Sequence, residues 1–309
     1  MKVIYIGTRN SIILESLITS GHQVIGIVES RSNNPTQLRS ILCVIYDNFQ
    51  RLNHKKVTQL PSVAKMYKIP LFVAFKNKQD QLKKWVSSLN PEIILIHGMT
   101  ELLKKEIFNI PKYGAINLHQ SLLPNYRGPN PDFWVYYYMD LNPGVTVHKI
   151  DSGEDSGDIL LQESFPLKLG TSLKEYRQKY LEIGSKLMLQ VLTALENNRP
   201  INPHKQSTEK LVRARRINPI EYHIIIDWQN WPIERIFHFL RGTMTHINTI
   251  HLPQFNSHKW DVVSFKKEIT EKPYGSIIYD NNKIYLVCKD GLIELKRNFS
   301  LIKLIKSLV

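Results

Sequence analysis

The first 28 residues read as a strand, a helix and a second strand, and this order constrains the fold more than any other feature. Residues 2–7 and 22–28 are short apolar runs rich in Val and Ile. Between them, residues 11–20 carry apolar side chains at helical spacing, and Gly21 ends the helix. A strand–helix–strand unit joins two parallel strands. We therefore expect an α/β fold with a doubly wound, mostly parallel sheet.

The alternation continues to residue 99. The apolar patterns predict a helix at 61–68, a strand at 69–74, a helix at 79–89 and a central buried strand at 91–99. Open α/β sheets bind ligands at the carboxyl ends of their strands, so Gly98 and Met99 are expected to face a cleft. The turn after the first strand lacks the G-x-G-x-x-G pattern of dinucleotide sites, which disfavours a nicotinamide or flavin enzyme.

Three polar side chains further on suggest chemistry. Asn117 and His119 lie two apart in the strand-like run 114–119, so they point to the same side. Asp155 lies in an acidic loop, residues 151–158, whose two glycines allow the backbone to turn sharply back toward the imidazole. Such an amide and imidazole can stabilise an oxyanion while the carboxylate orients the imidazole or relays a proton. This favours acyl transfer without a metal or a protein nucleophile, although each residue taken alone could have a purely structural role.

The order of several separate motifs resembles the folate-dependent formyltransferases, which include methionyl-tRNA formyltransferase, sugar N-formyltransferases and glycinamide ribonucleotide formyltransferase. The motifs are NLHQSLLP at 117–124, YRG at 126–128, GVTVH at 144–148 and DSGD at 155–158. The resemblance implies a Rossmann-like formyltransferase domain and the co-substrate 10-formyltetrahydrofolate, with no metal. It also implies that Asn117, His119 and Asp155 are the catalytic residues.

The same resemblance implies which residues line the folate site. Two of its segments follow the catalytic motifs, and the third is the end of the strand at 91–99. The implied residues are Gly98, Met99, Ser121, Leu122, Leu123, Pro124, Asp151, Ser152, Gly153 and Glu154.

The C-terminal third predicts a separate β domain. Residues 172–197 form one long predicted helix, and residues 201–218 form a basic linker that contains Pro203 and is flanked by Pro200 and Pro219. Strands are expected at 224–228, 246–252, 260–265, 275–279, 283–288 and 292–296, with a helix at 232–241. Short strands joined by hairpins suggest a small β-barrel, and this part resembles the C-terminal domain of methionyl-tRNA formyltransferase and of aminoarabinose-type sugar formyltransferases. We therefore expect a catalytic domain at 1–200, a linker at 201–218 and a C-terminal domain at 219–309.

The amino-acid composition limits the cellular location and the binding partners that we expect. The 309 residues carry a net charge of +14, which favours a phosphate-bearing partner such as tRNA or a nucleotide-linked sugar, although a basic surface alone does not identify one. The two cysteines lie far apart, so no disulfide framework is implied. The N-terminus leads directly into a strand, and no apolar run approaches the ~20 residues of a membrane span. We expect a cytoplasmic enzyme that does not contact the membrane, and a homodimer is a possible assembly.

The amine acceptor is the least constrained part of the prediction. Residues 30–60, interpreted as an inserted amphipathic helix, contain no glycine, whereas the tRNA enzymes carry a glycine-rich basic loop in this region. An aromatic residue follows Pro131-Asp132, which is more similar to the sugar enzymes, although the aminoarabinose enzymes carry arginine at the position of Pro129. A nucleotide-linked amino sugar is therefore the preferred acceptor. Methionyl-tRNA is the alternative, and a non-catalytic RNA-binding protein is a second alternative.

Overall fold

A computed structural model describes two compact units. The described residues are 1–8, 12–32, 59–75, 77–207, 209, 211–243 and 260–297. Unit 1 consists of Met1–Arg127, Gly144–Ser164 and Lys179–Val212, and unit 2 of Gly128–Pro143, Phe165–Gln178 and Arg213–Val309. Each unit thus combines segments that are distant in sequence. The boundaries expected at 200 and 218 divide the chain differently, and they stay a prediction.

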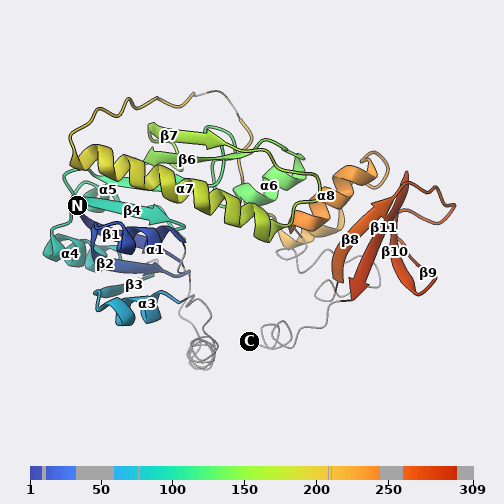
Figure 1. Cartoon of the computed structure of the whole chain (residues 1–309), viewed down its shortest axis with the longest axis horizontal. Helices are drawn as coiled ribbons and strands as arrows, with labels where there is room; N and C mark the ends of the chain where they lie inside the picture. Colours follow the sequence, from blue (N-terminus) through green and yellow to red (C-terminus); the bar gives the residue numbers. More distant parts are fainter. Residues whose placement is uncertain are drawn as a thin grey trace. The chain divides into compact units, whose positions relative to one another are not determined.

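Unit 1 is built on a seven-stranded sheet (Figure 1). Its strands are β1 (Lys2–Gly7), β2 (Gln23–Ser30), β3 (Leu71–Ala74), β4 (Ile93–His97), β5 (Ala115–His119), β6 (Gly144–Lys149) and β7 (Ile159–Ser164), in the order β3-β2-β1-β4-β5-β6-β7. The strands from β3 to β5 are parallel, while β6 and β7 are antiparallel additions. The predicted doubly wound, mostly parallel sheet is confirmed.

The helices of this part of the chain begin and end within about two residues of the expected positions. They are α1 (Ile12–Thr19), α3 (Leu60–Tyr67), α4 (Gln79–Leu89) and α7 (Leu173–Glu196), and a short α5 (Lys105–Phe108) was not predicted. Helix α4 buries Leu82 and Val86, which are four residues apart and lie on one face, against the strands of the sheet. The core is therefore a continuous apolar layer between the sheet and its helices.

The strand order places the site. Successive strands are added toward one edge of the sheet from β1 to β3 and toward the other edge from β4 onward, so the order of the strands reverses between β1 and β4. At such a switch point, open α/β sheets bind ligands beside the carboxyl ends of their parallel strands. Gly98 directly follows β4, and His119 is the last residue of the neighbouring parallel strand β5. Both residues therefore lie at the same edge of the sheet.

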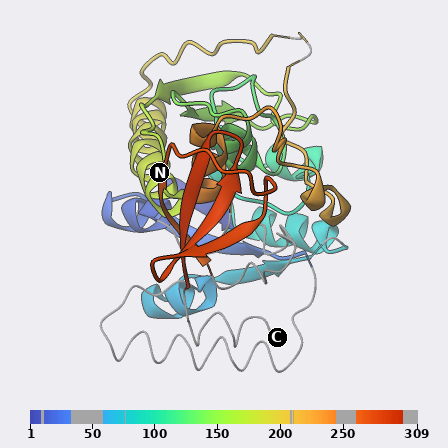
Figure 2. The same ribbon diagram turned by 90° about the vertical axis from the view of Figure 1, so that its right-hand side faces the viewer.

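The described part of unit 2 contains α-helices, a short 3₁₀ helix and a second sheet (Figure 2). The elements are α6 (Pro131–Tyr137), η1 (Pro219–His223), α8 (Ile233–Thr243), β8 (Trp260–Lys266), β9 (Ile277–Asp280), β10 (Lys283–Cys288) and β11 (Gly291–Arg297). The four strands are antiparallel in the order β8-β11-β10-β9. The separate C-terminal β structure is confirmed as a four-stranded sheet. The expected strand at 246–252 lies outside the described residues, as do residues 33–58 of the expected amphipathic helix.

The expected strand at 224–228 is wrong. Asn218 accepts a hydrogen bond from the backbone of Ile220 and starts η1, which carries the chain to Ile224. The carboxylate of Asp227 then accepts hydrogen bonds from the backbone N–H groups of Gln229 and Asn230 and forms a turn. Local side-chain hydrogen bonds therefore override the apolar Ile-Ile-Ile run, whose first side chain is exposed.

No helix in the described part of the chain is both long and apolar enough to cross a membrane.

His238 on α8 is fully buried in unit 2. Its Nδ1 accepts a hydrogen bond of 3.0 Å from the backbone N–H of Gly170, and its ring lies 4.7 Å from the ring of Tyr136. Burial lowers the pKa of His238 to about 4, because the imidazolium would lose its hydration. The unfolded chain, with an ordinary histidine pKa of about 6.5, therefore binds a proton more readily than the folded one.

This predicts an acid-sensitive stability. Neutral His238 makes its full contribution to the free energy of unfolding above about pH 6.5, and this contribution is lost as the pH falls toward 4. The free energy of unfolding should therefore decrease by about 2 kcal/mol between pH 7 and pH 5. The variant His238→Asn, whose side-chain oxygen can replace Nδ1 as acceptor, should lose less free energy of unfolding over this range. Urea denaturation at both pH values measures the difference, with His204→Asn at an exposed histidine as control. Equal pH dependence in wild type and His238→Asn would contradict the assignment.

Candidate functional site

Strand β5 presents Asn117 and His119 on one side, as the alternation of a strand requires. The antiparallel neighbour β6 places His148 directly opposite Asn117 in the register. His119 and His148 are both buried, with 5% and 0% of their surfaces exposed. The register therefore gathers an amide and two imidazoles at the end of the sheet.

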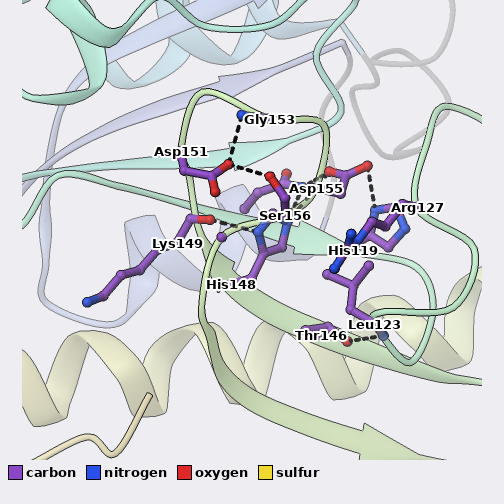
Figure 3. A network of polar contacts seen from close by, with 12 residues as sticks. His119, Leu123, Arg127, Thr146, His148, Lys149, Asp151, Gly153, Asp155 and Ser156 are labelled. Atoms are coloured by element: carbon purple, nitrogen blue, oxygen red, sulfur yellow. Dashed lines mark hydrogen bonds and ion pairs between the residues drawn. The ribbon is translucent and has the colours of Figure 1, made fainter. Parts of the chain in front are cut away.

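The loop between β6 and β7 brings Asp155 close to the side chains of Asn117, His119 and His148. It is a tight loop, because the carboxylate of Asp151 accepts hydrogen bonds from the backbone N–H of Gly153 and the hydroxyl of Ser156 (Figure 3). A Cβ on Gly157 would lie 2.0 Å from the carbonyl oxygen of Lys149, so only glycine allows this approach. The left-handed residue, however, is Asp155 itself, with φ of 51°. The loop turns back toward His119 as predicted, but the residue with the left-handed backbone conformation is Asp155 and not one of the two glycines.

The Asp155 carboxylate contacts both residues of β5. Its Oδ2 lies 3.5 Å from Nδ1 of His119 (Figure 3). Its Oδ1 lies 3.4 Å from the amide nitrogen of Asn117. Both contacts are longer than a strong hydrogen bond of about 2.6–3.2 Å. The structure therefore brings together the three residues singled out in the sequence, with room for adjustment when a substrate binds.

The proton position on His119 follows from its other neighbour. The Nε2 atom lies 2.8 Å from the carbonyl oxygen of Tyr126, which can only accept, so Nε2 carries the hydrogen. Nδ1, facing Asp155, is then the basic nitrogen of the neutral ring. Burial lowers the pKa of His119 below its usual value and outweighs the opposing effect of the Asp155 charge. Near neutral pH the ring is thus an unprotonated base aimed at a carboxylate.

His148 is a site residue to which the sequence assigned no role. Its Nδ1 donates to the carbonyl oxygen of Lys149 at 2.8 Å, so Nε2 is an acceptor for the amide nitrogen of Asn117 at 3.1 Å. This bond fixes which end of the Asn117 amide points into the site. The one available signal was the strand pairing of 144–148 with 114–119, which places the two residues opposite each other.

The segments expected to line a folate site are held rigidly. The hydroxyl of Thr146 donates to the carbonyl oxygen of Ser121 and accepts from the backbone N–H of Leu123. Gln162 donates to the carbonyl oxygen of Leu123 at 2.6 Å, and the Leu123-Pro124 peptide bond is cis. The Ser121 hydroxyl itself donates to the carbonyl oxygen of Asn125, so it has a structural role in this segment.

The other expected folate residues lie on two different elements. Gly98, with φ of 80°, follows β4, and Met99 packs against the core of unit 1. Asp151, Ser152 and Gly153 are exposed and Glu154 is half-buried in the loop that carries Asp155. Contact of these residues with folate stays a prediction. Across the described residues, no group of three His, Cys, Asp or Glu side chains is arranged to hold a metal ion.

Comparison with known proteins identifies the family. The model of the formyl transferase family matches residues 11–192. The chain belongs to the formyl transferase family. Methionyl-tRNA formyltransferase of Alkaliphilus oremlandii is 28% identical over 285 residues, which cover 90% of this chain and 84% of that protein. The methionyl-tRNA formyltransferase of Caldicellulosiruptor saccharolyticus is 34% identical over 213 residues, covering 68% and 67%. The chain is therefore a transferase enzyme, as predicted.

Solved structures show the same fold. An N-formyltransferase from Helicobacter canadensis, in complex with folinic acid and dTDP-3-aminofucose, superimposes with a TM-score of 0.65 at 17% identity, covering 97% of this chain and all of that one. A sugar 3-N-formyltransferase crystallised with dTDP and 5-N-formyltetrahydrofolate gives a TM-score of 0.63, also at 17% identity, with 97% and 99% covered.

The electrostatics of His119 can be measured directly. We expect a His119 pKa below 6.5 in the folded enzyme, and a further decrease in Asp155→Asn, because the carboxylate stabilises the imidazolium. Titration of the histidine ring protons by NMR tests this, with the His119 signal assigned by its loss in His119→Asn. Asp80→Asn, at an exposed carboxylate on α4, is the control. A His119 pKa that stays constant or rises in Asp155→Asn would refute the described contact.

Proposed function

We propose that this formyltransferase moves the formyl group of 10-formyltetrahydrofolate to a primary amine, using Asn117, His119 and Asp155. The observation that carries the proposal is the contact of one carboxylate with both an amide and a buried imidazole at the end of β5. A family member with a purely structural interior at this place would have no reason to bury a basic nitrogen against a carboxylate.

The donor set around this group suits a folate. A pterin is a flat ring system with amide-like donors and acceptors along its edge, so it needs backbone groups for its edge and apolar side chains for its faces. Gly98 and Met99 after β4, and Leu122 to Pro124 after β5, follow neighbouring parallel strands and offer both kinds of group. Residues 151–154 add exposed backbone from the loop that carries Asp155. When bound, 10-formyltetrahydrofolate supplies the activated formyl carbon.

The chain's own residues then manage charge and protons. Attack of the neutral amine on the formyl carbon creates an oxyanion, which an N–H of Asn117 can stabilise by giving up its long contact with Asp155. His148 keeps the amide in the orientation that presents this N–H. Loss of one oxyanion donor typically costs a factor of 10² to 10³ in turnover.

His119 handles the proton of the attacking amine. Its Nδ1 accepts that proton, and Asp155 stabilises the resulting imidazolium. The Nε2–H group meanwhile keeps its hydrogen bond to the carbonyl oxygen of Tyr126. The protonated Nδ1 can then return the proton to the departing N10 amine as the tetrahedral carbon collapses. Formyl group and proton are thereby transferred without a covalent enzyme intermediate.

The acceptor we propose is an amino sugar carried on a nucleotide. The support is the absence of glycine in residues 30–60 and the fold shared with sugar N-formyltransferases over 97% of the chain. The aromatic stretch at 133–134 gives less support than its sequence suggested, because Phe133 and Trp134 are buried in the packing of α6. Methionyl-tRNA is the second candidate, supported by the names of the relatives that share 28% and 34% identity.

The catalytic assignment predicts the behaviour of single variants. Asn117→Ala and His119→Ala should lower kcat by roughly 10² to 10³, because each removes a group that interacts with the transition state. Single-turnover formyl transfer under saturating donor measures the effect, and circular dichroism checks that each variant is folded. Near-normal turnover in either variant would sink the assignment.

The choice of acceptor predicts a salt dependence. Radiolabelled formyl donor is offered with dTDP-, GDP- and UDP-linked amino sugars and with methionyl-tRNA, at low and at near-physiological salt. We expect formylation of at least one sugar, with weak salt dependence, because a sugar nucleotide presents only two phosphates, whereas tRNA binding neutralises many and weakens steeply with salt. Formylation of the tRNA at a rate far above that of every sugar would replace the first acceptor by the second.

A further inference from the structure

Two residues beside the imidazole of His119 hold a backbone conformation that side chains disfavour. Tyr126 has φ of 59° and Asp155 has φ of 51°. A non-glycine residue in this region persists only where surrounding contacts stabilise it. The same two residues supply the neighbours of both ring nitrogens: Tyr126 the carbonyl oxygen at Nε2, and Asp155 the carboxylate at Nδ1. Contacts that hold the loop carrying Tyr126 and the loop carrying Asp155 in place therefore also hold the imidazole of His119 between its two partners.

The side-chain amide of Gln206 connects the two loops. Its Nε2 donates to the carbonyl oxygens of Asp155 and Gly157 at 2.9 and 2.7 Å. Its Oε1 accepts from Nε and Nη2 of Arg127 at 2.9 and 2.7 Å. Both amide hydrogens and the carbonyl oxygen are thus engaged, two bonds on each loop. Because two of these bonds come from a guanidinium, they are charge-assisted and strong.

Gln206 itself is fixed by the segment that follows α7. The backbone of His204 pairs with Ile159 of β7 through hydrogen bonds of 2.8 and 2.9 Å. Six residues beyond Gln206, the carbonyl oxygen of Val212 accepts from the backbone N–H of Tyr126 at 2.8 Å. Residues 204–207 and 211–212, which belong to the stretch 201–218 interpreted from sequence as a surface linker, therefore contact both loops of the site within unit 1.

We propose that Gln206 is a positioning residue, which, with Arg127, sets the distance between the two groups that bracket His119. The inference rests on the proposed catalytic role of that histidine. The contacts form a closed ring, from His119 to Tyr126, through the peptide bond to Arg127, to Gln206, to Asp155 and back to His119. Removing the amide opens this ring and lets Asp155 relax from its left-handed conformation, with its carboxylate withdrawn from the imidazole.

The test compares Gln206→Ala and Gln206→Glu with Gln79→Ala. Gln206→Glu keeps an acceptor for Arg127 but faces two carbonyl oxygens without a hydrogen, so it removes only the bonds to the Asp155 loop. Gln79 is a matched control, since its amide donates to the carbonyl oxygen of Leu102 at 2.7 Å and accepts from the backbone N–H of Lys104 at 2.9 Å, outside the site. Two readouts are taken: kcat and KM for formyl transfer, and the His119 pKa by NMR, which requires no acceptor.

We expect both Gln206 variants to lower kcat by about 10- to 100-fold with little change in the KM of the formyl donor, as a small displacement of a catalytic group does. The His119 pKa should fall in Gln206→Ala, in the direction given by Asp155→Asn, because the carboxylate that stabilises the imidazolium has moved away. Gln79→Ala should lower stability alone. If Gln206→Ala does not fold, the kcat of Gln206→Glu decides the question.

A His119 pKa and a kcat at wild-type values in a folded Gln206 variant would overturn the proposal. A shift of the His119 pKa without any formyl transfer by the wild-type enzyme would instead refute the proposed function and leave the positioning role in place. The two failures are therefore distinguishable.

Discussion

The contact between His119 and Asp155 is the interaction on which the rest of the site depends. A carboxylate and a neutral imidazole are costly to bury, and each needs a defined partner to remain in place. Here the carboxylate arrives on a loop after β6 and the imidazole on the last residue of β5, so their meeting requires the antiparallel pairing of these two strands. The fold supplies that pairing at the edge where the parallel strands end, and the candidate site lies where the sheet changes from parallel to antiparallel.

The sequence predicted this part of the fold because its signals are local. Apolar runs and helical spacing define β1, α1 and β2, and the period of a strand places Asn117 and His119 on one side. The motif spacing also indicated that Asp155 returns to them, and it does. The expected strand at 224–228 failed for a local reason too, because the side chains of Asn218 and Asp227 accept hydrogen bonds from nearby backbone N–H groups and form a 3₁₀ helix and a turn around the apolar run.

What the sequence could not provide were contacts that depend on register and on distant segments. His148 meets Asn117 only because two strands pair in one register, and a shift by one residue would point it to the other face of the sheet. Gln206 lies 51 residues from Asp155 and 79 from Arg127, in a segment whose composition suggested a solvated linker. The glycines of the acidic loop were correctly noted, but the space they leave serves a neighbouring backbone and hydroxyl, while the left-handed conformation falls on Asp155.

The position of Gln206 and Val212 in the sequence determines when, during synthesis, the loops around His119 can be connected. All strands from β1 to β7 have been synthesised once residue 164 has been added to the chain. The loops around His119 acquire their last ties only when Gln206 and Val212 arrive, after the whole of α7 has been synthesised. During synthesis there is thus an interval in which the chain contains every strand of this sheet but not yet the residues that connect the two loops. The contacts that connect the loops on either side of His119 are therefore completed late in synthesis, by residues that lie outside β5 and β6.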